Sequence, residues 1–552
     1  MLALLGLVTP AGAEPAHGRG GVVATGHPLA TEAGLNALTK GGNAVDAAMA
    51  AALTLGVVDG HNSGIGGGCF ILIRLASGEC VAIDGRETAP AAAHRDMFLQ
   101  GGKADTRRSQ IGPLASGTPG ALAAYETAAS KYGKLPLEEH LLAAAAIAEN
   151  GFAINGIYAG RLKGRAGELA AFESSRAVFL KPDGQPFAEG ETLKQPDLAR
   201  TYRAIASEGV AWFYDGPFAR AADDWMGQNG GALSEDDFRN YRCRFRDPIH
   251  TTYRGYEIVG FPPPSSGGVH VLQLLNIVEN FDLRGLHHHS ADSIHVVAES
   301  MKLAFADRAF WLGDPEFVPV PRGLLAKTYA KQLAGQITMH AAAPVPGHGT
   351  PERATDDLFE KHTTHFSTAD AAGNWVACTA TINTSFGSQV VVPGTGVILN
   401  NQMDDFSIQP GVPNAFNLIG GEANAVAPGK RPLSSMSPTI VLKEGQPVLA
   451  AGAAGGPTII SQTLLTIINF IDFEMPVEAA VASPRFHHQW QPDELRIERA
   501  IAAEVREELR KRGHKLSETD TFGVCQAVGR REVAEQLTGI ADPRAAGSAA
   551  GH

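Results

Sequence analysis

The residue pattern predicts an α/β protein in which antiparallel sheets pack in layers against helices. Short runs of strand-forming residues occur in pairs around turn residues, as β-hairpins require. Long helix-patterned stretches separate these pairs without the regular spacing of βαβ units, and no internal repeat is visible. Hydrophobic residues make up 44% and charged residues 19% of the 552 residues, which is typical of a closely packed globular protein.

The N-terminal part of the chain is expected to be mainly helical. An Ala-rich stretch predicts a closely packed helix, because Ala has the highest helix propensity. Two runs of apolar and β-branched residues around a Gly-containing turn predict a hairpin. In order, the expected elements are a helix within residues 41–53, strands 69–74 and 81–84, and helices over 141–154 and 290–312 in a mostly helical region from 119 to 314, broken by a turn at 262–268.

The C-terminal part alternates hairpins with one helix. Pro and Gly residues among polar neighbours predict an exposed, flexible connector over residues 340–358. Alternation in the second strand that follows places Thr379, Thr381 and Asn383 on one face, with Thr381 and Asn383 side by side. The other face carries Val376, Cys378, Ala380 and Ile382. In order, the expected elements are strands 364–368 and 375–383, strands 439–442 and 447–451, and a helix over 458–473.

Charge and cysteine content exclude several classes of protein. The formal net charge of −12 argues against a nucleic-acid partner, because binding to the phosphate backbone needs clustered Lys and Arg. The five cysteines are scattered and form no Cys-x-x-Cys pair, so a disulfide framework or a zinc ribbon is not expected. A bridge between Cys69 and Cys80 across their hairpin is an alternative, but buried free thiols are favoured.

The N-terminus has the pattern of a secretory leader. Residues 1–13 are short and apolar and end in an Ala-x-Ala site before the first charge, although the usual basic start is missing. No other stretch has the eighteen or more uninterrupted apolar residues of a membrane span. The expected location is therefore periplasmic or secreted.

Thr363 becomes chemically unusual if the chain is cut before it. A threonine hydroxyl is a poor nucleophile, but cleavage between His362 and Thr363 leaves a free α-amino group, which titrates at about 7.7–8.0. That amine is a general base beside the hydroxyl. Polar residues within 381–405 and 434–437 lie between strand-like apolar runs, so several are expected to share one interior in which each needs a partner or a ligand.

Seven stretches, in one order along the chain, carry a resemblance to a known family. They are residues 84–90, 115–120, 262–268, 363–367, 400–406, 431–439 and 484–490. From about residue 19 to the C-terminus the chain resembles the γ-glutamyltranspeptidase family of N-terminal-nucleophile hydrolases. The resemblance implies a four-layer αββα sandwich, formed as one compact unit from the two autocleavage products of a precursor.

The resemblance also implies how the precursor is divided. After removal of residues 1–13 as a signal peptide, residues 14–362 form a large chain and residues 363–552 a small catalytic chain. Thr363 is implied to be the nucleophile, with Thr381 as a hydroxyl that assists it. The backbone N–H groups of Gly455 and Gly456 are implied to form the oxyanion hole.

The implied substrate is a γ-glutamyl compound such as glutathione. The resemblance assigns its α-carboxylate to Arg86, Ser434 and Ser435, and its α-ammonium to Asn383, Gln402 and Asp405. A guanidinium can hold a carboxylate by two parallel hydrogen bonds, and among the second group only Asp405 brings a charge opposite to the ammonium. The acyl group passes through an ester on Thr363 to water or to an amine or peptide acceptor, with no cofactor.

Two departures from the family pattern leave the preferred acyl group open. Where the family commonly has Ser-Pro-Gly-Gly-Ser-Arg, residues 453–458 contain Pro457, which has no N–H, and no cation. Residues 410–418 resemble the lid of the family, with Phe416 where a tyrosine is common. The alternatives are a glutaryl-side-chain cephalosporin acylase of the same family and, in a different class, an uncut exported protein that only binds amino acids.

Two further patterns suggest other ligands but are better explained by packing. The histidine runs at 287–289 and 487–488 lack metal-ligand spacing on a helix face, and adjacent histidines on a strand point to opposite sides, so no metal is expected. The Gly-rich loop at 63–68 lacks the Lys-Ser/Thr ending of a phosphate loop. It is interpreted as a close-packed turn near the active site.

Overall fold

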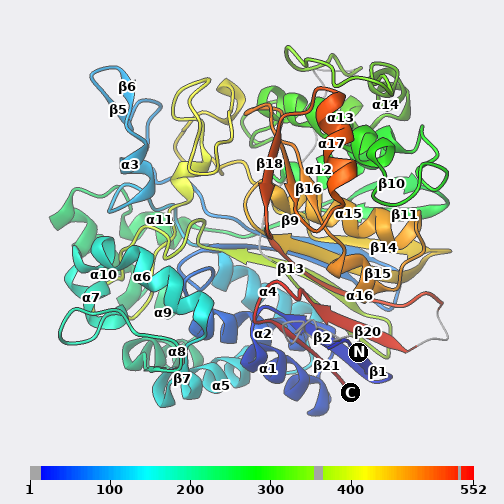
Figure 1. Cartoon of the computed structure of the whole chain (residues 1–552). Helices are drawn as coiled ribbons and strands as arrows, with labels where there is room; N and C mark the ends of the chain where they lie inside the picture. The colour runs from blue at the N-terminus through cyan, green and yellow to red at the C-terminus, as the bar shows by residue number, and fades with distance from the viewer. Residues whose placement is uncertain (1–13, 353–364, 533–535) are drawn as a thin grey trace, which may run out of the picture.

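Two seven-stranded antiparallel sheets lie face to face in the centre of the molecule, and helices cover the outer face of each (Figure 1). The computed structural model describes residues 14–352, 365–532 and 536–552. This arrangement of helix, sheet, sheet and helix layers confirms the four-layer αββα sandwich.

The strands of the first sheet, called sheet I, come mostly from the C-terminal part of the chain. In spatial order they are β1 (Ala16–Gly18), β20 (Leu537–Ala541), β19 (Val524–Gly529), β15 (Gln446–Ala454), β14 (Thr439–Lys443), β11 (Tyr256–Gly260) and β10 (Ile249–Tyr253). Each neighbouring pair is antiparallel.

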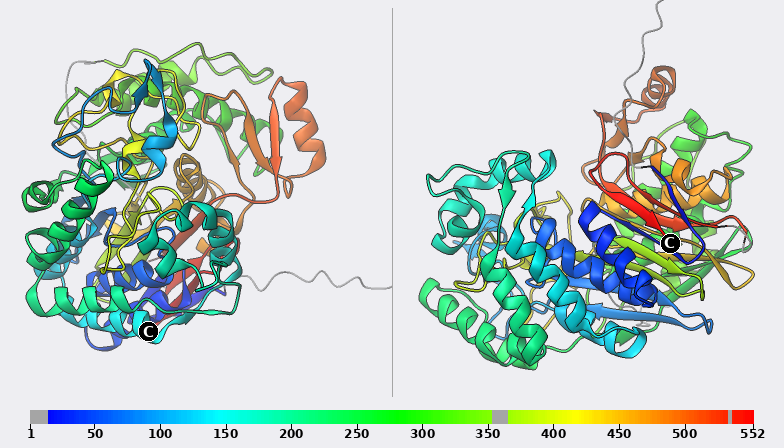
Figure 2. Two further views of the ribbon diagram at one scale, coloured as in Figure 1. Left: turned by 90° about the vertical axis from the view of Figure 1, so that its left-hand side faces the viewer. Right: turned by 90° about the horizontal axis from the view of Figure 1, so that it is seen from below.

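The second sheet, called sheet II, combines strands from both ends of the chain. In spatial order they are β21 (Ser548–Gly551), β2 (Gly21–Thr25), β12 (Phe366–Asp370), β13 (Trp375–Thr381), β3 (Gly68–Arg74), β4 (Cys80–Gly85) and β9 (Arg244–Arg246). Because β21 pairs with β2, the C-terminus lies beside the dark-blue N-terminal strands (Figure 2).

Because side chains alternate along each strand, the strands contribute to two kinds of core. One lies between the two sheets, and the other lies between a sheet and its covering helices. In β13 the side chains of Trp375 and Ala377 face sheet I, whereas Val376, Cys378 and Ala380 face the helices. The ring of Phe70 on β3 stacks on Phe261, which follows β11, with centroids 4.3 Å apart. The predicted face of β13 that carries Val376, Cys378 and Ala380 is therefore confirmed.

Small side chains let the helices on sheet II pack closely. The helices that contact sheet II are α1 (Pro28–Thr39), α2 (Ala44–Val58) and α4 (Ala121–Tyr132). Helix α5 (Leu137–Asn150) packs on α2 and α4, and α8 (Pro196–Glu208) packs on α5. Every residue of α2 is buried, which its Ala-rich sequence allows. Its N-terminus carries a capping box, in which the Asn43 side chain accepts from the backbone while Asp46 accepts from the Asn43 N–H.

Helices α12 (Ser266–Val278) and α15 (Thr458–Ile471) lie on sheet I, and every residue of both is buried. Helices α13 (Ala291–Trp311) and α14 (Lys327–Ala334) pack on α12, and all four are seen above the sheets in Figure 1. The remaining helices are α3 (Thr106–Gln110), α6 (Gly156–Ala170), α7 (Glu173–Phe179), α9 (Ala211–Tyr214), α10 (Pro217–Asn229), α11 (Glu235–Asn240), α16 (Val477–Ala482) and α17 (Ala503–Lys511). A small sheet of β16 (Phe486–His487), β17 (Leu495–Glu498) and β18 (Leu516–Thr519) and two short ribbons, β5 (Leu99–Gln100) with β6 (Lys103–Ala104) and β7 (Phe152–Ala153) with β8 (Thr192–Leu193), complete the fold.

The predicted hairpins and helices are confirmed within a few residues, and the region from 119 to 314 is mostly helical as predicted. The predicted strand pairs are β3 with β4, β12 with β13, and β14 with β15, and the helices are α2, α5, α13 and α15. This region also supplies β9 to the edge of sheet II and β10 to the edge of sheet I, with β11 between β10 and β14. These strands are short and partly exposed, so their apolar pattern is weak.

The register of the β3–β4 hairpin does not allow a disulfide between Cys69 and Cys80. Cys69 pairs with Gly85 and Cys80 with Arg74, so the two cysteines lie at opposite ends of the hairpin. All five cysteines are free, and Cys69 is buried as favoured. Of the helices in the described residues, none is long and apolar enough to cross a membrane.

The processing junction falls outside the described residues. The described residues do not include the predicted leader at 1–13, the cleavage pair of His362 and Thr363, or the second part of the connector. The first part, residues 340–352, forms no helix or strand, but it is anchored. Trp490 Nε1 donates to Val345 O at 2.8 Å, and Gly349 N donates to the Asp307 carboxylate at 2.8 Å. Residues 340–352 are exposed or half-buried apart from Pro351, as expected of a connector, and these contacts hold them against the body of the protein.

Candidate active site

A central cavity of about 530 Å³ lies where strands and loops of both sheets end. Its lining contains most of the predicted site residues, namely Thr381, Asn383, Gln402, Asp405, Ser434, Ser435, Gly455 and Gly456. They come from the end of β13, the 3-10 helix η2 (Gln402–Asp405), the loop before β14 and the turn after β15. Thr363 lies outside the described residues, and Arg86 does not line the cavity.

The turn between β15 and α15 presents two backbone amides without acceptors. Gly455 and Gly456 have φ values of +134° and +61°, a conformation that side chains disfavour. Thr458 Oγ1 donates to Gly455 O at 2.8 Å, and Gln462 Nε2 donates to Ala454 O at 3.0 Å, so the turn is held from behind. Neither glycine N–H donates to an acceptor within the described residues. Two such amides suit a developing negative oxygen.

Pro457 does not disturb this turn. It is the residue before the first turn of α15, with φ of −62°, where its missing N–H costs little. The segment around Phe416 lies over the turn, because a Cβ added to Gly456 would be 2.6 Å from the Phe416 ring. Gln489 Nε2 donates to Asn417 O at 3.1 Å and holds this segment in place.

The end of β13 forms the next part of the wall. Thr381 Oγ1 accepts from Asn383 N at 2.8 Å, so the two residues are neighbours as predicted. Asn383 has φ of +80°, and its amide donates to Asn401 O at 2.9 Å. The neighbouring Gln402 Oε1 is buried without a hydrogen-bond partner in the described residues. An unpaired buried acceptor is costly, so this oxygen is available to a ligand that donates.

Arg86 and Asp405 form a direct ion pair. Arg86 Nη2 donates to Asp405 Oδ2 at 2.6 Å, and the same guanidinium donates to Pro432 O and Leu433 O. The Arg86 side chain is 0% exposed and that of Asp405 is 12% exposed, so the carboxylate lies between Arg86 and the cavity. Burial raises the pKa of Asp405, and the attraction of Arg86 opposes this shift.

Arg308 on α13 is a cavity residue that the sequence analysis did not single out. Its Nε donates to Ser266 Oγ at 2.8 Å, and its Nη2 donates to Ser435 Oγ at 3.2 Å. Burial lowers the pKa of Arg308 to about 10, although Asp405 attracts the cation. Helical periodicity cannot locate Arg308, because every residue from Ser293 to Arg308 is buried.

Two loop residues that the sequence analysis did not assign hold the site together. Asn401 Nδ2 donates to Gln110 O at 2.9 Å and to Thr384 Oγ1 at 2.8 Å. The Asp404 carboxylate accepts from Ser109 Oγ at 2.6 Å and from Ala415 N at 2.9 Å, which ties η2 to the covering segment. They belong to the matched stretch 400–406, but only the fold identifies their partners.

The cavity histidines are poor bases. Burial lowers the pKa of His365 to about 3, and its Nε2 is 2.5 Å from Ser367 Oγ. Burial also lowers the pKa of His61 to about 3. Each imidazole is therefore neutral at pH 7 and has little tendency to accept a proton.

The Gly-rich loop at 63–68 packs behind β13. A Cβ at Gly66 would be 2.0 Å from Ile398 O, and a Cβ at Gly67 would be 1.9 Å from Thr381 O. Only glycine permits these approaches. The interpretation as a close-packed turn near the site is confirmed.

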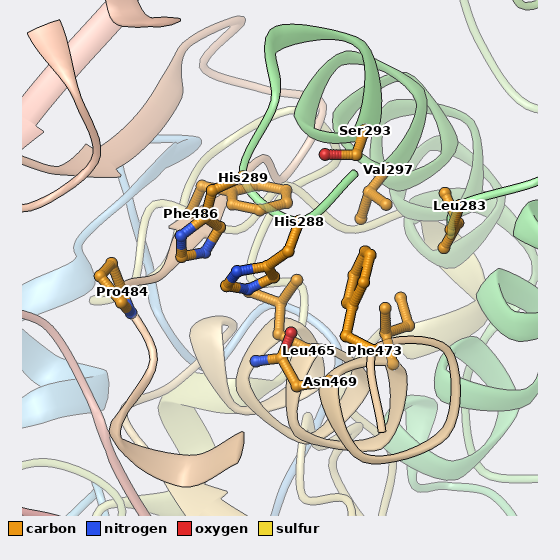
Figure 3. Close-up of a pocket in the computed structure, with 11 residues that line it drawn as sticks. Leu283, His288, His289, Ser293, Val297, Leu465, Asn469, Phe473, Pro484 and Phe486 are labelled. Carbon is orange, nitrogen blue, oxygen red and sulfur yellow. The ribbon is translucent and has the colours of Figure 1, made fainter. Parts of the chain in front are cut away.

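The histidine runs lie away from the central cavity. His288 and His289 line a separate cavity of about 20 Å³ next to Phe473 and Phe486, shown in Figure 3. This volume is close to that of one water molecule. Ser483 Oγ and His288 Nε2 are 3.2 Å apart, so part of the run is already hydrogen-bonded.

One buried cluster of side chains could ligate a metal ion, but a lysine already neutralises the charge of its carboxylate. The candidate ligand atoms of His295, Glu299 and His514 lie within 4.8 Å of one another. Lys302 Nζ donates to Glu299 Oε1 at 3.0 Å, and His295 Nδ1 is 2.8 Å from His514 Nε2. Ala343 N also donates to Glu299 at 2.9 Å. The group is thus a hydrogen-bond network that ties α13 to the connector, with an ammonium as its cation.

The model of the γ-glutamyltranspeptidase family matches residues 30–552. The chain belongs to the γ-glutamyltranspeptidase family. This member is 44% identical to the glutathione hydrolase proenzyme of Escherichia coli (strain K12), over 96% of this chain and 91% of the relative. It is 41% identical to the acylase ACY 1 proenzyme of Pseudomonas sp. (strain SE83), over 91% of this chain and 88% of the relative.

A solved structure supports the fold of this γ-glutamyltranspeptidase family member. The cephalosporin acylase from Bacillus halodurans superimposes with a TM-score of 0.89 and 30% sequence identity, over 100% of this chain and 99% of the other. The relatives therefore include proteins named for glutathione hydrolysis and for acylase activity, so membership alone does not select the acyl group.

Proposed function

We propose that this protein is an autoprocessed γ-glutamyl acyltransferase and hydrolase that cleaves the γ-glutamyl amide of glutathione and related compounds. The proposal rests on the observation that the central cavity contains both groups that can bind an amino acid and groups that can stabilise an oxyanion. An acid and neutral acceptors suited to an α-ammonium lie in the same cavity as two backbone amides that find no acceptor in the described part of the chain and suit an oxyanion. Relatives named glutathione hydrolase proenzymes support this choice of substrate.

The proposed reaction begins with cleavage of the bond between His362 and Thr363. The new α-amino group takes the proton of the Thr363 hydroxyl as the oxygen attacks the γ-carbonyl carbon, and Thr381 assists through its hydroxyl. The amides of Gly455 and Gly456 stabilise the tetrahedral oxyanion. The protonated amine then gives its proton to the leaving amine as the carbon–nitrogen bond breaks, which leaves an ester on Thr363.

The second half of the reaction releases the acyl group. Water or an amine acceptor attacks the ester carbonyl, the Thr363 amine takes the proton from the attacking group, and Thr363 leaves with a proton restored. The freed amine suits the role of base because the cavity histidines titrate at about 3. No step requires a metal or a cofactor.

Substrate recognition is proposed to use the charges of the α-amino acid. Its ammonium has three donors, which match the Asp405 carboxylate and the acceptors of Gln402 and Asn383. Its carboxylate is assigned to the hydroxyls of Ser434 and Ser435 and, by family resemblance, to Arg86. Residues 14–362 and 363–552 are proposed to remain associated as two chains of one precursor, exported to the periplasm after removal of residues 1–13.

A second candidate function is a glutaryl-side-chain cephalosporin acylase. The specific observation in its favour is the similarity to relatives named as acylases, together with Phe416 against Gly456 where the family commonly has a tyrosine. A glutaryl group has the distal carboxylate but no ammonium. Retention of Asn383, Gln402 and Asp405 in the cavity favours γ-glutamyl compounds as the main substrates.

Denaturing electrophoresis with N-terminal sequencing tests the proposal. We expect two fragments, the smaller beginning at Thr363, and a single uncut band for Thr363→Ala. Hydrolysis of γ-glutamyl anilide should accompany cleavage and be absent in the variant. A mature wild-type protein that remains one band and binds glutamate without hydrolysis would instead be an amino-acid-binding protein.

A further inference from the structure

One wall of the central cavity is formed by the turn after α2 and by α6, and the proposed mechanism does not use it. Asp59 and Asn62 of the turn line this wall together with Arg161 of α6. Ile382 N donates to Asn62 O at 3.0 Å, so the turn lies beside the end of β13 that carries Thr381. None of the three wall residues is assigned to the acyl group, so they are available to the amine that leaves from it or attacks it.

Asp59 occupies a position that destabilises a carboxylate. It is the C-cap residue of α2, where the negative end of the helix dipole repels an anion. It forms no ion pair with Lys or Arg in the described part of the chain. By contrast Asp472, the C-cap residue of α15, lies 3.1 Å from Arg254 Nε. A cavity acid kept at a helix C-terminus without a cation is a candidate for a functional role.

Neutral donors hold the Asp59 carboxylate in place. Asn62 Nδ2 donates to Asp59 Oδ1 at 3.0 Å and to His61 Nε2 at 3.1 Å. Because His61 Nε2 accepts, the proton of the neutral imidazole is on Nδ1, which lies 3.3 Å from Asp59 Oδ1. The carboxylate is therefore oriented without being neutralised.

The titratable and charged groups around this turn come from α6 and from the start of α1. Tyr158 of α6 packs edge-on against the His61 ring with centroids 4.7 Å apart, and burial and the charge of Asp59 raise the pKa of this phenol. Arg161 of α6 and His27, the N-cap residue of α1, lower the pKa of His61. Burial lowers the pKa of His27 itself to about 4 and raises the pKa of Asp59 to about 7. Of these groups, only the carboxyl of Asp59 exchanges its proton near neutral pH.

We propose that Asp59 takes a proton from the ammonium of an incoming amine acceptor and so favours transfer of the acyl group over its hydrolysis. This inference rests on the proposed function. The acceptor class is an α-amino acid or peptide with a free α-ammonium, which has no lone pair with which to attack. Transfer of one proton to the Asp59 carboxylate leaves a neutral amine.

The remaining protons follow the mechanism already proposed. The lone pair of the neutral amine forms the new carbon–nitrogen bond, and the bond between the acyl carbon and the Thr363 oxygen breaks. The Thr363 amine takes the second proton from the attacking nitrogen and passes it to the leaving oxygen. Asp59 then loses its proton to solvent. Asp59 is thus a catalytic residue of the transfer step, whereas hydrolysis, in which water attacks, has no ammonium to deprotonate.

The pH dependence of transfer tests this role. About a tenth of an α-amine with a pKa of about 8 is unprotonated at pH 7, and most of it is unprotonated at pH 9. With γ-glutamyl anilide as donor and glycylglycine as acceptor, we expect Asp59→Asn to lower kcat/KM for the acceptor by about threefold to tenfold at pH 7 and by less than about twofold at pH 9. Release of glutamate without an acceptor should fall far less than transfer at pH 7.

Two controls separate proton transfer from a structural effect. Hydroxylamine is already unprotonated at pH 7, so its acylation should be insensitive to Asp59→Asn. Asp472→Asn removes a C-cap acid outside the cavity lining and should change neither hydrolysis nor transfer. Its thermal transition should fall because Arg254 loses its partner, whereas that of Asp59→Asn should be unchanged or higher.

The outcomes distinguish this inference from the proposed function. Unchanged transfer in Asp59→Asn, equal losses at pH 7 and pH 9, or equal losses of hydrolysis and transfer would overturn the role of Asp59. A wild type that releases glutamate but forms no γ-glutamyl-glycylglycine would also overturn it and would leave the hydrolase activity in place. A processed wild type that does neither would refute the proposed function itself.

Discussion

At the scale of single residues, the main feature of the site is the ion pair between Arg86 and Asp405, which places one positive and one negative charge side by side as an α-amino acid does. Arg86 and Asp405 are in contact at 2.6 Å, and Gln402 Oε1 has no partner in the described residues. An α-amino acid brings one charge of each sign, so its ammonium can meet Asp405 and Gln402 while its carboxylate meets the cavity-lining hydroxyls of Ser434 and Ser435. Binding of the amino acid then buries few charges that lack a partner.

Replacing Asp405 should separate the two candidate acyl groups. We expect Asp405→Ala to lower kcat/KM for γ-glutamyl anilide by on the order of 10–100-fold, since a charge-assisted hydrogen bond to the ammonium is lost. For glutaryl anilide, which has no ammonium, the change should be below about threefold. Asp405→Asn keeps the shape of the side chain and should follow the same order, and equal losses on both substrates would count against this assignment.

At the scale of elements, the turn from β15 to α15 links the oxyanion site to its covering segment. Gly456 needs a positive φ of +61° and leaves space that the Phe416 ring fills. The turn is held by Thr458 and Gln462 at the start of α15. Backbone geometry here therefore depends on a helix start, and not on Pro457 or on a cation.

A methyl group at this turn tests its contribution. Gly456→Ala should lower kcat by about tenfold or more, because the Cβ would displace Phe416 and move an amide that serves the oxyanion. The measurement is kcat for γ-glutamyl anilide with processing verified by electrophoresis. Gly445→Ala is the matched control, because Gly445 also has a positive φ, +75°, but no atoms within 4 Å of an added Cβ. It should lose about 1 kcal/mol of stability and keep its kcat. An unchanged kcat in Gly456→Ala would contradict the role of the turn.

At the scale of the whole molecule, the central cavity extends from the two sheets to helix α6. Arg161 and Arg165, one turn apart on α6, line it together with Asn155. Arg165 Nη1 is 3.4 Å from Glu168 Oε1, whereas the side chain of Arg161 forms no ion pair or hydrogen bond within the described residues. In a protein with a net charge of −12, a cation at this end suits an anionic part of a substrate beyond the acyl group.

Substrates with charged and neutral leaving groups should distinguish Arg161. We expect Arg161→Ala to raise KM for glutathione, whose leaving dipeptide carries a carboxylate, by about threefold to tenfold. The KM for γ-glutamyl anilide should stay unchanged. Lys163→Ala removes the same charge from the same helix but outside the cavity lining, so it should affect neither substrate. Parallel changes on both substrates would show that the charge acts elsewhere.

Local sequence patterns determined the hairpins and the helices, because side-chain alternation and Ala-rich composition act within a few residues. The β12–β13 hairpin and the fully buried α2 follow from such patterns. The motif set, read as a family resemblance, also indicated most of the cavity lining. The sequence did not reveal β9 and β10, since short edge strands with exposed residues carry little apolar pattern, and β11 was missed with its partner β10.

The tertiary structure alone decided which charged groups meet. Arg86 and Asp405 are separated by 319 residues, and Arg308 and Ser435 by 127 residues, yet each pair is in hydrogen-bond contact. No local pattern distinguishes the arginine that is neutralised by a carboxylate from the one that faces the cavity. That distinction depends on long-range packing of α13 and the loop before β14, and therefore on the assembled sandwich.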